Sequence, residues 1–298
     1  MKDTANTTQA KLMLLSAMAI WGSIGIIRHY IPVDSGTLAL LRSVIGAVCM
    51  ALLLAVLRRH ADWSGIRANG RLLVLSGFAV GINWLLLFEA FKHTSVAVAT
   101  VCYYMAPIGV MLFSPLVLGE PINRRKGLGI LMAFIGIAFV SGLFSADNAG
   151  VTLTGVLYGL GAATFYMSVV LLNKRMTPME PYTKTGVQLA ASATVLLPYI
   201  VFQQWNTPMD WAIWTPTVIG LTLILGFVYT GLACALYFGS MDRLPAQTVA
   251  LFSYLDPILA VILSTILLGE PLTPSLVIGT ILVLGGAFIG ERQPKARS

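Results

Sequence analysis

Long apolar stretches recur along the whole chain, and the short segments between them hold most of the charged residues. A helix needs roughly 20 apolar residues to cross a bilayer core about 30 Å thick. Because these stretches are continuously apolar rather than alternating with period two, they predict helices and not barrel strands. Ten such transmembrane helices are predicted, near residues 11–28, 35–57, 72–91, 94–118, 127–144, 151–173, 182–202, 215–239, 245–268 and 272–290.

The composition agrees with an all-α integral membrane protein. Of the 298 residues, 57% are hydrophobic and 10% are charged, whereas a soluble domain carries about 25% charged residues. A chain with so few charges cannot cover itself with a solvated surface. The composition therefore excludes a soluble enzyme, a soluble nucleic-acid binder and a disordered protein, and it makes the lipid bilayer the first partner.

The basic residues predict how the helices are oriented. If the N-terminus is cytoplasmic, nearly all of the 19 Lys and Arg residues fall on cytoplasmic segments; only Arg28 and Lys92 fall on the other side, and Arg42 lies within a span. Cytoplasmic loops carry an excess of Lys and Arg. We therefore expect a multi-pass protein of the cytoplasmic (inner) membrane with both termini in the cytoplasm. The orientation in the bilayer thereby explains the net charge of +7, and no nucleic-acid partner is expected.

Two segments of the chain match each other without gaps. Residues 81–121 and 231–271 share a Tyr-x-x-Pro motif and end in the same Gly-Glu-Pro triplet. The first five predicted helices (1–147) and the last five (148–298) thus form two repeats. Because five is an odd number, the second repeat enters the membrane from the opposite side. Inverted repeats are typical of secondary transporters, in which two similar halves exchange conformations around a central site.

These motifs also resemble a known family. The chain is similar to the ten-helix EamA-type carriers of the drug/metabolite transporter superfamily over residues 11–290. The similarity rests on AIWG (19–22), LLRSVIGA (40–47), the two Tyr-x-x-Pro helices and the two Leu-Gly-Glu-Pro ends. The resemblance implies two inverted five-helix repeats around a central cavity lined by helices 1, 3, 4, 6, 8 and 9. It also implies export of amino acids, other metabolites or drugs, while some relatives exchange sugar phosphates or nucleotide sugars.

Asp256 is the acid that lies deepest in a predicted span, the ninth. Burying a charge in the membrane costs at least about 2.5–3.5 kcal/mol, so the carboxyl needs a partner or water. Two interpretations stay open. Asp256 either couples transport to protons or binds a substrate amine, or else it forms a structural ion pair or bonds a backbone carbonyl. The first repeat has Ala106 at the matching position, which favours a specific role.

Arg42 is the one basic residue predicted within a span, in the second helix. A guanidinium can bind a substrate carboxylate through two hydrogen bonds. It can equally pair with an acid or extend toward the membrane surface. We favour the structural interpretation, because the second helix is peripheral in the resembled fold.

Glu89 and His93 are four residues apart near the end of the third predicted helix, so they share one helical face. A carboxylate beside an imidazole is able to titrate near neutral pH. The pair is therefore either a proton relay or simply the polar end of a helix, and the second interpretation is favoured.

Aromatic residues and prolines are predicted to line the central cavity. A proline inside a helix frees the carbonyl four residues earlier, which suits a bendable helix beside water or polar groups. Aromatic rings suit a ligand that is partly apolar or cationic. The residues predicted to line the cavity are Trp21, Asn83, Trp84, Tyr104, Pro107, Tyr158, Tyr166, Tyr229, Tyr254 and Pro257.

These features predict a secondary active transporter, an exporter that moves a small organic solute by alternating access and couples to protons through Asp256 or Glu89. The alternatives are an exchanger of phosphorylated or nucleotide-linked sugars, an intramembrane enzyme and a channel. No HExxH, Gly-x-Ser-x-Gly or metal-spacing motif is present, so neither a metal nor a cofactor is expected. Monomer and homodimer both fit the sequence.

Overall fold

The computed structural model describes residues 2–142, 151–206, 209–241 and 243–291. Within these ranges the regular structure is entirely helical. Nine segments of the described chain are long and apolar enough to cross a membrane. The remaining predicted span corresponds to α7, which has 17 residues and begins with three basic ones. With α7, the ten-helix membrane fold is confirmed.

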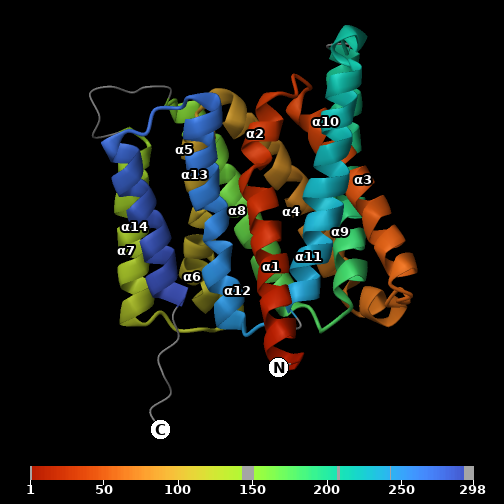
Figure 1. The fold of residues 1–298 in the computed structure, drawn as a ribbon, viewed down its shortest axis with the longest axis horizontal. Helices are drawn as coiled ribbons and strands as arrows, with labels where there is room; N and C mark the ends of the chain where they lie inside the picture. Colours follow the sequence, from red (N-terminus) through yellow and green to blue (C-terminus); the bar gives the residue numbers. More distant parts are fainter. Residues whose placement is uncertain (1, 143–150, 207–208, 242, 292–298) are drawn as a thin grey trace.

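The helices stand side by side between two faces of the molecule (Figure 1). We call the face that carries the N-terminus the proximal face and the opposite one the distal face. The first repeat consists of α1 (Lys2–Gly22), α2 (Ile24–His29), α3 (Ser35–Val56), α4 (Trp63–His93), α5 (Val96–Tyr103), α6 (Met105–Leu118) and α7 (Arg124–Val140). The second consists of α8 (Leu153–Arg175), α9 (Pro181–Asn206), η1 (Trp211–Ile213), α10 (Pro216–Gly226), the π-helical segment η2 (Phe227–Leu232), α11 (Ala233–Met241), α12 (Ala246–Ser253), α13 (Leu255–Leu268) and α14 (Pro274–Glu291).

The two repeats have the same local geometry at opposite faces. The fourth helix of each repeat is interrupted at its tyrosine, Tyr104 between α5 and α6 and Tyr254 between α12 and α13. Each then ends at a glycine with a left-handed backbone, at φ 71° for Gly119 and φ 68° for Gly269, a conformation that other residues avoid. Because α6 ends at the proximal face and α13 at the distal face (Figure 1), the predicted inversion is confirmed.

Two helices extend into segments that were predicted as loops. α4 begins at Trp63 rather than near residue 72, because Asp62 caps it: its Oδ1 accepts hydrogen bonds from the Gly65 N–H (2.8 Å) and the Ser64 hydroxyl (2.7 Å). α9 continues to Asn206 rather than ending near 202. Hydropathy reports where a helix leaves the apolar layer, not where it ends, so both extensions were missed.

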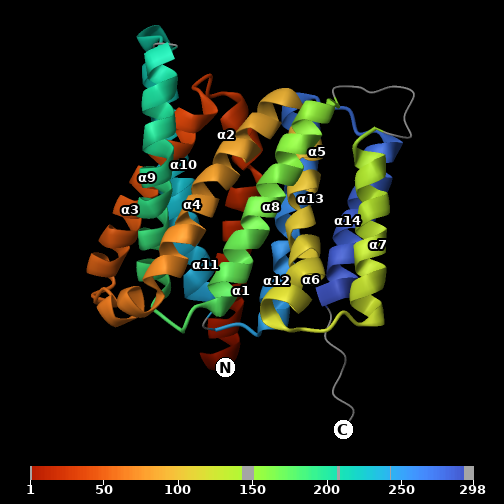
Figure 2. The ribbon, with the colours of Figure 1, turned by 180° about the vertical axis from the view of Figure 1, so that it is seen from behind.

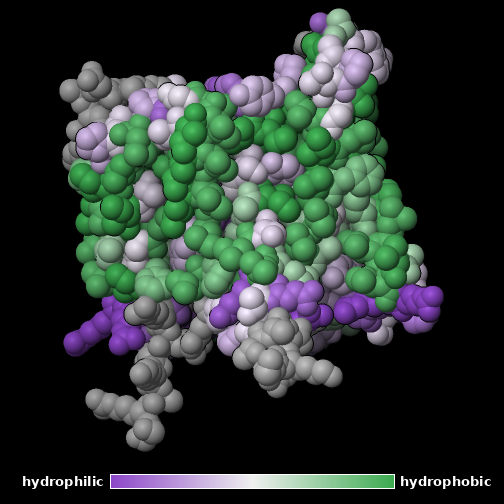
Figure 3. All heavy atoms as spheres, in the orientation of Figure 1, coloured by the Kyte–Doolittle hydropathy of each residue, from purple (hydrophilic) through white to green (hydrophobic). Residues whose placement is uncertain are grey.

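The surface has the character of a membrane protein. Hydrophobic atoms cover the middle of the molecule, and strongly hydrophilic atoms gather along the proximal edge (Figure 3). Exposed apolar side chains include Leu116 and Ile266, at 80% and 70% exposure. Arg59, Arg67 and Arg124 are exposed at the proximal ends of helices. Apolar exposure of this extent is stable only against lipid.

Helix pairs from the two repeats interlock along the molecule. At one end α7 packs against α14, and in the middle α4 packs against α8 (Figures 1 and 2). The α7–α14 contact passes through glycines: an added Cβ on Gly136 would lie 2.8 Å from the Gly279 carbonyl oxygen. Small residues let membrane helices approach this closely. Between the two ends, helices of both repeats surround one pocket.

Candidate substrate pocket

A pocket of about 340 Å³ lies between the repeats, within the range of about 300–1,000 Å³ typical of small-molecule sites. Its walls come from both repeats. The first repeat contributes residues of α1, α2, α3, α4, α5 and α6, and the second contributes residues of α8, α9, η2, α11, α12 and α13. The resemblance did not imply the helices that correspond to α3 and α9. The predicted residues that line it are Trp21, Arg42, Asn83, Trp84, Tyr104, Pro107, Tyr166, Tyr229 and Asp256.

Five other predicted residues lie away from the pocket walls. Tyr158 packs against His93 with ring centroids 5.2 Å apart, and Glu89 lies on the same helix end as His93. Pro257 is buried within α13. Tyr254 packs against Phe288 of α14 and donates its hydroxyl to Glu291 at 3.0 Å. The position that matches Glu291 in the first repeat is occupied by Ser141. Tyr104 therefore has no equivalent acid to bond on α7, and its side chain points in another direction.

Tyr104 reaches across to the second repeat. Its hydroxyl lies 2.9 Å from Oδ2 of Asp256 and 3.1 Å from the carbonyl oxygen of Ser253. That carbonyl is the one that Pro257 leaves without its helical partner. Tyr104, between α5 and α6, thus supplies the hydrogen bond that is missing at the interruption between α12 and α13. Asp256 stays half-buried at the pocket wall, so its carboxyl remains able to meet a ligand.

Arg42 enters the pocket rather than extending to the surface. It is 6% exposed, its Nε donates to Oγ1 of Thr230 at 3.0 Å, and its guanidinium carbon lies 3.8 Å from the ring centroid of Trp84. A cation over an aromatic face is stabilised by the ring electrons. Among the ion pairs of the described residues, none includes Arg42. Of the two structural interpretations, the described part of the chain shows neither a pairing with an acid nor an extension to the surface, and Arg42 lies at the pocket wall instead.

The first and eighth helices meet at irregular backbone. The first helix is interrupted at Ser23, and the eighth changes to the π-helical η2. Trp21 donates its Nε1–H to the Tyr229 carbonyl at 3.0 Å, and the hydroxyls of Ser23 and Tyr229 lie 2.8 Å apart. π-Helical segments occur frequently at functional sites. Here the segment turns Tyr229 and Thr230 toward the pocket.

Sequence reasoning missed several residues of the pocket. Tyr103 packs against Tyr166 with ring centroids 5.3 Å apart. Gln188 is 6% exposed, and its amide donates to Ser76 Oγ and to Asn173 Oδ1, each at 2.7 Å. The available signal for Gln188 was its position opposite Arg42 when the early helices of the two repeats are aligned, at an offset of 146 residues. Thr230 gave no signal, because a threonine within an apolar span is ordinary.

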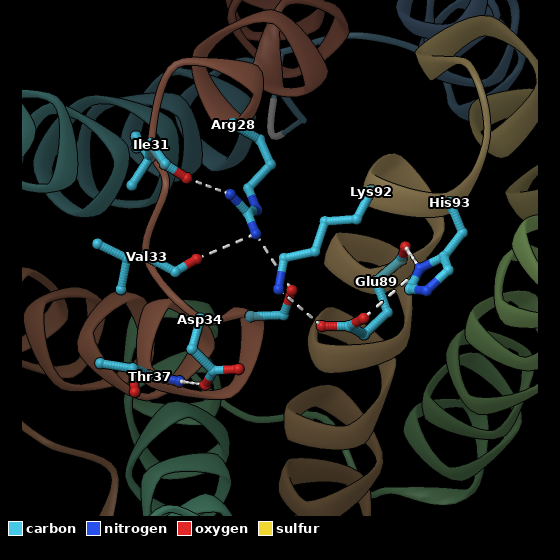
Figure 4. Close-up of polar contacts among 9 residues, drawn as sticks. Arg28, Ile31, Val33, Asp34, Thr37, Glu89, Lys92 and His93 are labelled. Carbon is cyan, nitrogen blue, oxygen red and sulfur yellow. Dashed lines mark hydrogen bonds and ion pairs between the residues drawn. The ribbon is translucent and has the colours of Figure 1, made fainter. Parts of the chain in front are cut away.

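A separate polar cluster lies at the distal end of α4 (Figure 4). Glu89 pairs with Lys92 at 3.0 Å and contacts His93 at 3.6 Å, and neither Glu89 nor His93 is among the described residues that line the pocket. Nearby, Arg28 is 4% exposed and donates to the Ile31 carbonyl, to the Val33 carbonyl at 3.2 Å and to Ser35. These bonds hold the turn between α2 and α3.

Asp34 caps α3 within this cluster. Its Oδ2 accepts a hydrogen bond from the Thr37 N–H at 2.9 Å. Burial raises the pKa of the Asp34 carboxyl, but hydrogen bonds from Gln203 and Thr37 outweigh it, so the pKa lies below its ordinary value. The cap therefore stays charged near neutral pH, which stabilises the N-terminus of α3.

Comparison with known proteins agrees with this architecture. The model of the EamA-like transporter family matches residues 8–142 and 153–290. The uncharacterized transporter YxxF of Bacillus subtilis is 26% identical over 294 residues, which cover 96% of this chain and 91% of that protein. Protein RarD of Salmonella typhimurium is 25% identical over 90% of this chain and 89% of its own length. One crystal structure superposes with a TM-score of 0.64 at 21% identity and covers 95% of this chain and 96% of its own.

The family match spans the first and the second repeat, and it covers nearly all of the residues that form the helices and the pocket. The match to the crystal structure shows a likeness of fold. The chain belongs to the EamA-like transporter family, and it is a multi-pass membrane transporter rather than an enzyme.

Proposed function

We propose that this transporter exports small zwitterionic metabolites, with amino acids first, across the cytoplasmic membrane. The observation that carries the proposal is the pairing of one cation and one acid at the walls of a single pocket. Arg42 can take a carboxylate through its terminal guanidinium nitrogens, and Asp256 can take an ammonium group. Aromatic side chains, among them Trp21, Trp84 and Tyr166, surround the remaining volume and suit the apolar part of such a molecule.

The proposed mechanism is alternating access between the two inverted repeats. Each pocket charge is bonded to the other repeat: Arg42 to Thr230, and Asp256 to Tyr104. A ligand that binds both charges therefore acts on both repeats at once. We place the domain boundary between residues 147 and 148, because five of the predicted helices lie on each side of it. The distribution of basic residues supports N- and C-termini in the cytoplasm.

Counterflow in proteoliposomes tests the substrate class. Liposomes are loaded with an unlabelled amino acid, the corresponding amine or the corresponding carboxylic acid, and entry of the labelled amino acid is followed. Saturable exchange with the zwitterion, and much weaker exchange with either single-charge analogue, is the expected result. Arg42→Lys and Asp256→Asn are the matched variants, since each keeps the approximate size of the side chain. Equal exchange of all three ligands would reject a two-charge site.

Proton coupling through Asp256 is tested separately. An imposed pH gradient is expected to accelerate uptake by the native protein and to have no effect on Asp256→Asn, because the amide cannot exchange a proton. Asp210→Asn is the control, since Asp210 caps η1 and is not among the described residues that line the pocket. If Asp256→Asn keeps the full response to the gradient, coupling through this residue is wrong.

Phosphorylated and nucleotide-linked sugars are the less supported candidates for the substrate. They require several cationic groups, and Arg42 is the one Lys or Arg among the described residues that line the pocket. Competition by a sugar phosphate in the same counterflow assay, at concentrations where amino acids fail to compete, would reverse this preference. Single-channel conductance would support the channel alternative.

A further inference from the structure

The distal ends of the two repeats are joined by one carboxylate. Glu270 follows the glycine that ends α13, and its side chain reaches the beginning of α5 in the first repeat. Oε1 accepts a hydrogen bond from the Val96 N–H at 2.7 Å, and Oε2 accepts one from the Ala97 N–H at 3.2 Å. The first N–H groups of a helix lack helical partners, and the helix dipole favours a negative charge there. The Glu270 carboxylate supplies both the hydrogen-bond acceptors and the negative charge.

This contact lies directly on the helices that form the pocket. α5 and α13 carry Tyr103 and Asp256 at the pocket walls, and their distal parts pack together through a hydrophobic cluster that includes Val98, Val101 and Val261. The Glu270 carboxylate thus holds the distal edge of the interface between the repeats. Separating α5 from α13 on this side requires that both hydrogen bonds break.

The inverted repeat provides a counterpart at the proximal face. Glu120 follows Gly119 at the end of α6, and its N–H bonds to the Ser114 carbonyl just as the Glu270 N–H bonds to Ser264. The Glu120 carboxylate contacts Lys126 at 3.2 Å and Lys174 at 3.8 Å and is 45% exposed.

In the second repeat the helix that matches α5 is α12, which begins at Ala246 after Pro245. Proline has no side-chain acceptor to cap a helix, whereas Ser95 caps α5. The N-terminus of α12 therefore suits an acceptor from elsewhere in the chain, and Glu120 stands at the position that matches Glu270.

We infer that Glu270 and Glu120 are alternating latches of the transport cycle. Glu270 on the N-terminus of α5 holds the distal side closed. In the opposite state Glu270 is released, and Glu120 leaves its lysines and caps α12 to hold the proximal side closed. This inference rests on the alternating access proposed above, but it does not depend on the substrate.

A thiol already present in the pocket reports the state of the distal side. Cys234 lines the pocket, whereas Cys49 and Cys102 are buried. Replacing the two buried cysteines with alanine leaves Cys234 as the one thiol of the chain. The protein is reconstituted in liposomes, and a membrane-impermeant maleimide is applied to the distal face, which is identified as the face opposite an N-terminal tag.

Glu270→Gln is expected to raise the labelling rate of Cys234 from the distal face by about tenfold, the order of effect of a lost charge-assisted hydrogen bond. Glu120→Gln is the matched control and is expected to lower it, because the distal-closed state then loses its competitor. No change in Glu270→Gln would overturn the inference. Equal increases in both variants would also overturn it, because they would indicate general loosening.

A second variant removes the donor instead of the acceptor. Val96→Pro deletes the N–H that bonds Oε1 of Glu270, and proline is favoured at the first position of a helix, so α5 is expected to fold. It too should raise distal labelling, but by less than Glu270→Gln, because Glu270 keeps its negative charge at the N-terminus of α5 and its bond to the Ala97 N–H. Labelling requires no substrate. A positive labelling result together with failed counterflow would therefore reject the substrate class and leave the latches standing.

Discussion

At the scale of single residues, the pocket depends on side chains that complete the other repeat. Tyr104 is the clearest case, because its hydroxyl serves both Asp256 and the carbonyl released by Pro257. Leaving such a buried group unpaired costs about 1–3 kcal/mol. Tyr104→Phe is therefore expected to lower the free energy of unfolding by that amount, measured as a lower unfolding temperature in detergent.

The same change is expected to weaken apparent substrate affinity in counterflow, since Asp256 loses its orientation. Tyr254→Phe is the matched control. It removes the hydroxyl that bonds Glu291, so it should lower stability and leave apparent affinity unchanged. If both variants weaken affinity equally, the different placement of the two tyrosines has no functional meaning.

Residue types in the pocket followed from the sequence better than their directions did. A buried acid, an intramembrane arginine and paired tyrosines are visible as exceptions in apolar helices. Which way each side chain points depends on the rotation of its helix and on its partners, such as the ring of Trp84 beneath Arg42. For Tyr254 a single acid on α14 decides the direction, and no periodicity within the ninth helix reports that acid.

At the scale of helices, Asp62 joins two turns at the proximal face. Besides capping α4, its Oδ2 accepts a hydrogen bond from the Glu180 N–H at 3.2 Å, just before α9. Hydrogen bonds from the Gly65 N–H, the Ser64 hydroxyl and the Glu180 N–H lower the pKa of the Asp62 carboxyl. A lowered pKa in the folded state means that the carboxylate stabilises the fold at neutral pH. The contribution is lost as the pH falls below the ordinary Asp value of about 3.9 and through the folded value.

We therefore expect Asp62→Ala to lower the unfolding temperature in detergent at pH 7 and to have a smaller effect near pH 3. At pH 7 the unfolding temperature of Asp62→Asn should lie between those of the native protein and Asp62→Ala, because asparagine is also a good helix cap but carries no charge. Asp210→Ala, at the short η1, is the control for losing an exposed acid. A constant difference between native protein and Asp62→Ala at both pH values would contradict the assignment.

The helix breaks differ in how far the sequence predicted them. Pro107 and Pro257 predicted bends in the helices that contain them. The structure has interruptions close to both prolines, between α5 and α6 and between α12 and α13. The interruption at Ser23 and the π-helical η2 carry no proline. They are stabilised by the contacts of Trp21 and Ser23 with Tyr229, which join residues 206 and 208 positions apart. Local sequence cannot report a backbone irregularity whose partner lies in the other repeat.

At the scale of the whole molecule, the alternating access that we propose requires some helices to move and others to hold the repeats together. The fourth and ninth helices line the pocket and carry the glutamate latches, whereas α7 and α14 contribute none of the described residues that line it. α7 and α14 instead pack together through reciprocal glycines: an added Cβ on Gly286 would lie 2.5 Å from the Gly129 carbonyl oxygen, and a Cβ on Gly129 would meet the Gly286 carbonyl in the same way. This pair is suited to hold the repeats together while the pocket helices exchange positions.

Gly129→Ala and Gly286→Ala are therefore expected to destabilise the protein to a similar extent, each by about 1–3 kcal/mol, the usual cost of overpacking. Gly285→Ala is the neighbouring control, since its Cβ would meet only Met132 at 3.7 Å. Unfolding temperatures in detergent should fall in the two variants and not in the control. Apparent substrate affinity in counterflow should stay unchanged in all three, because the pocket walls are untouched. A loss of affinity without a loss of stability would show that α7 and α14 move with the pocket helices and do not anchor them.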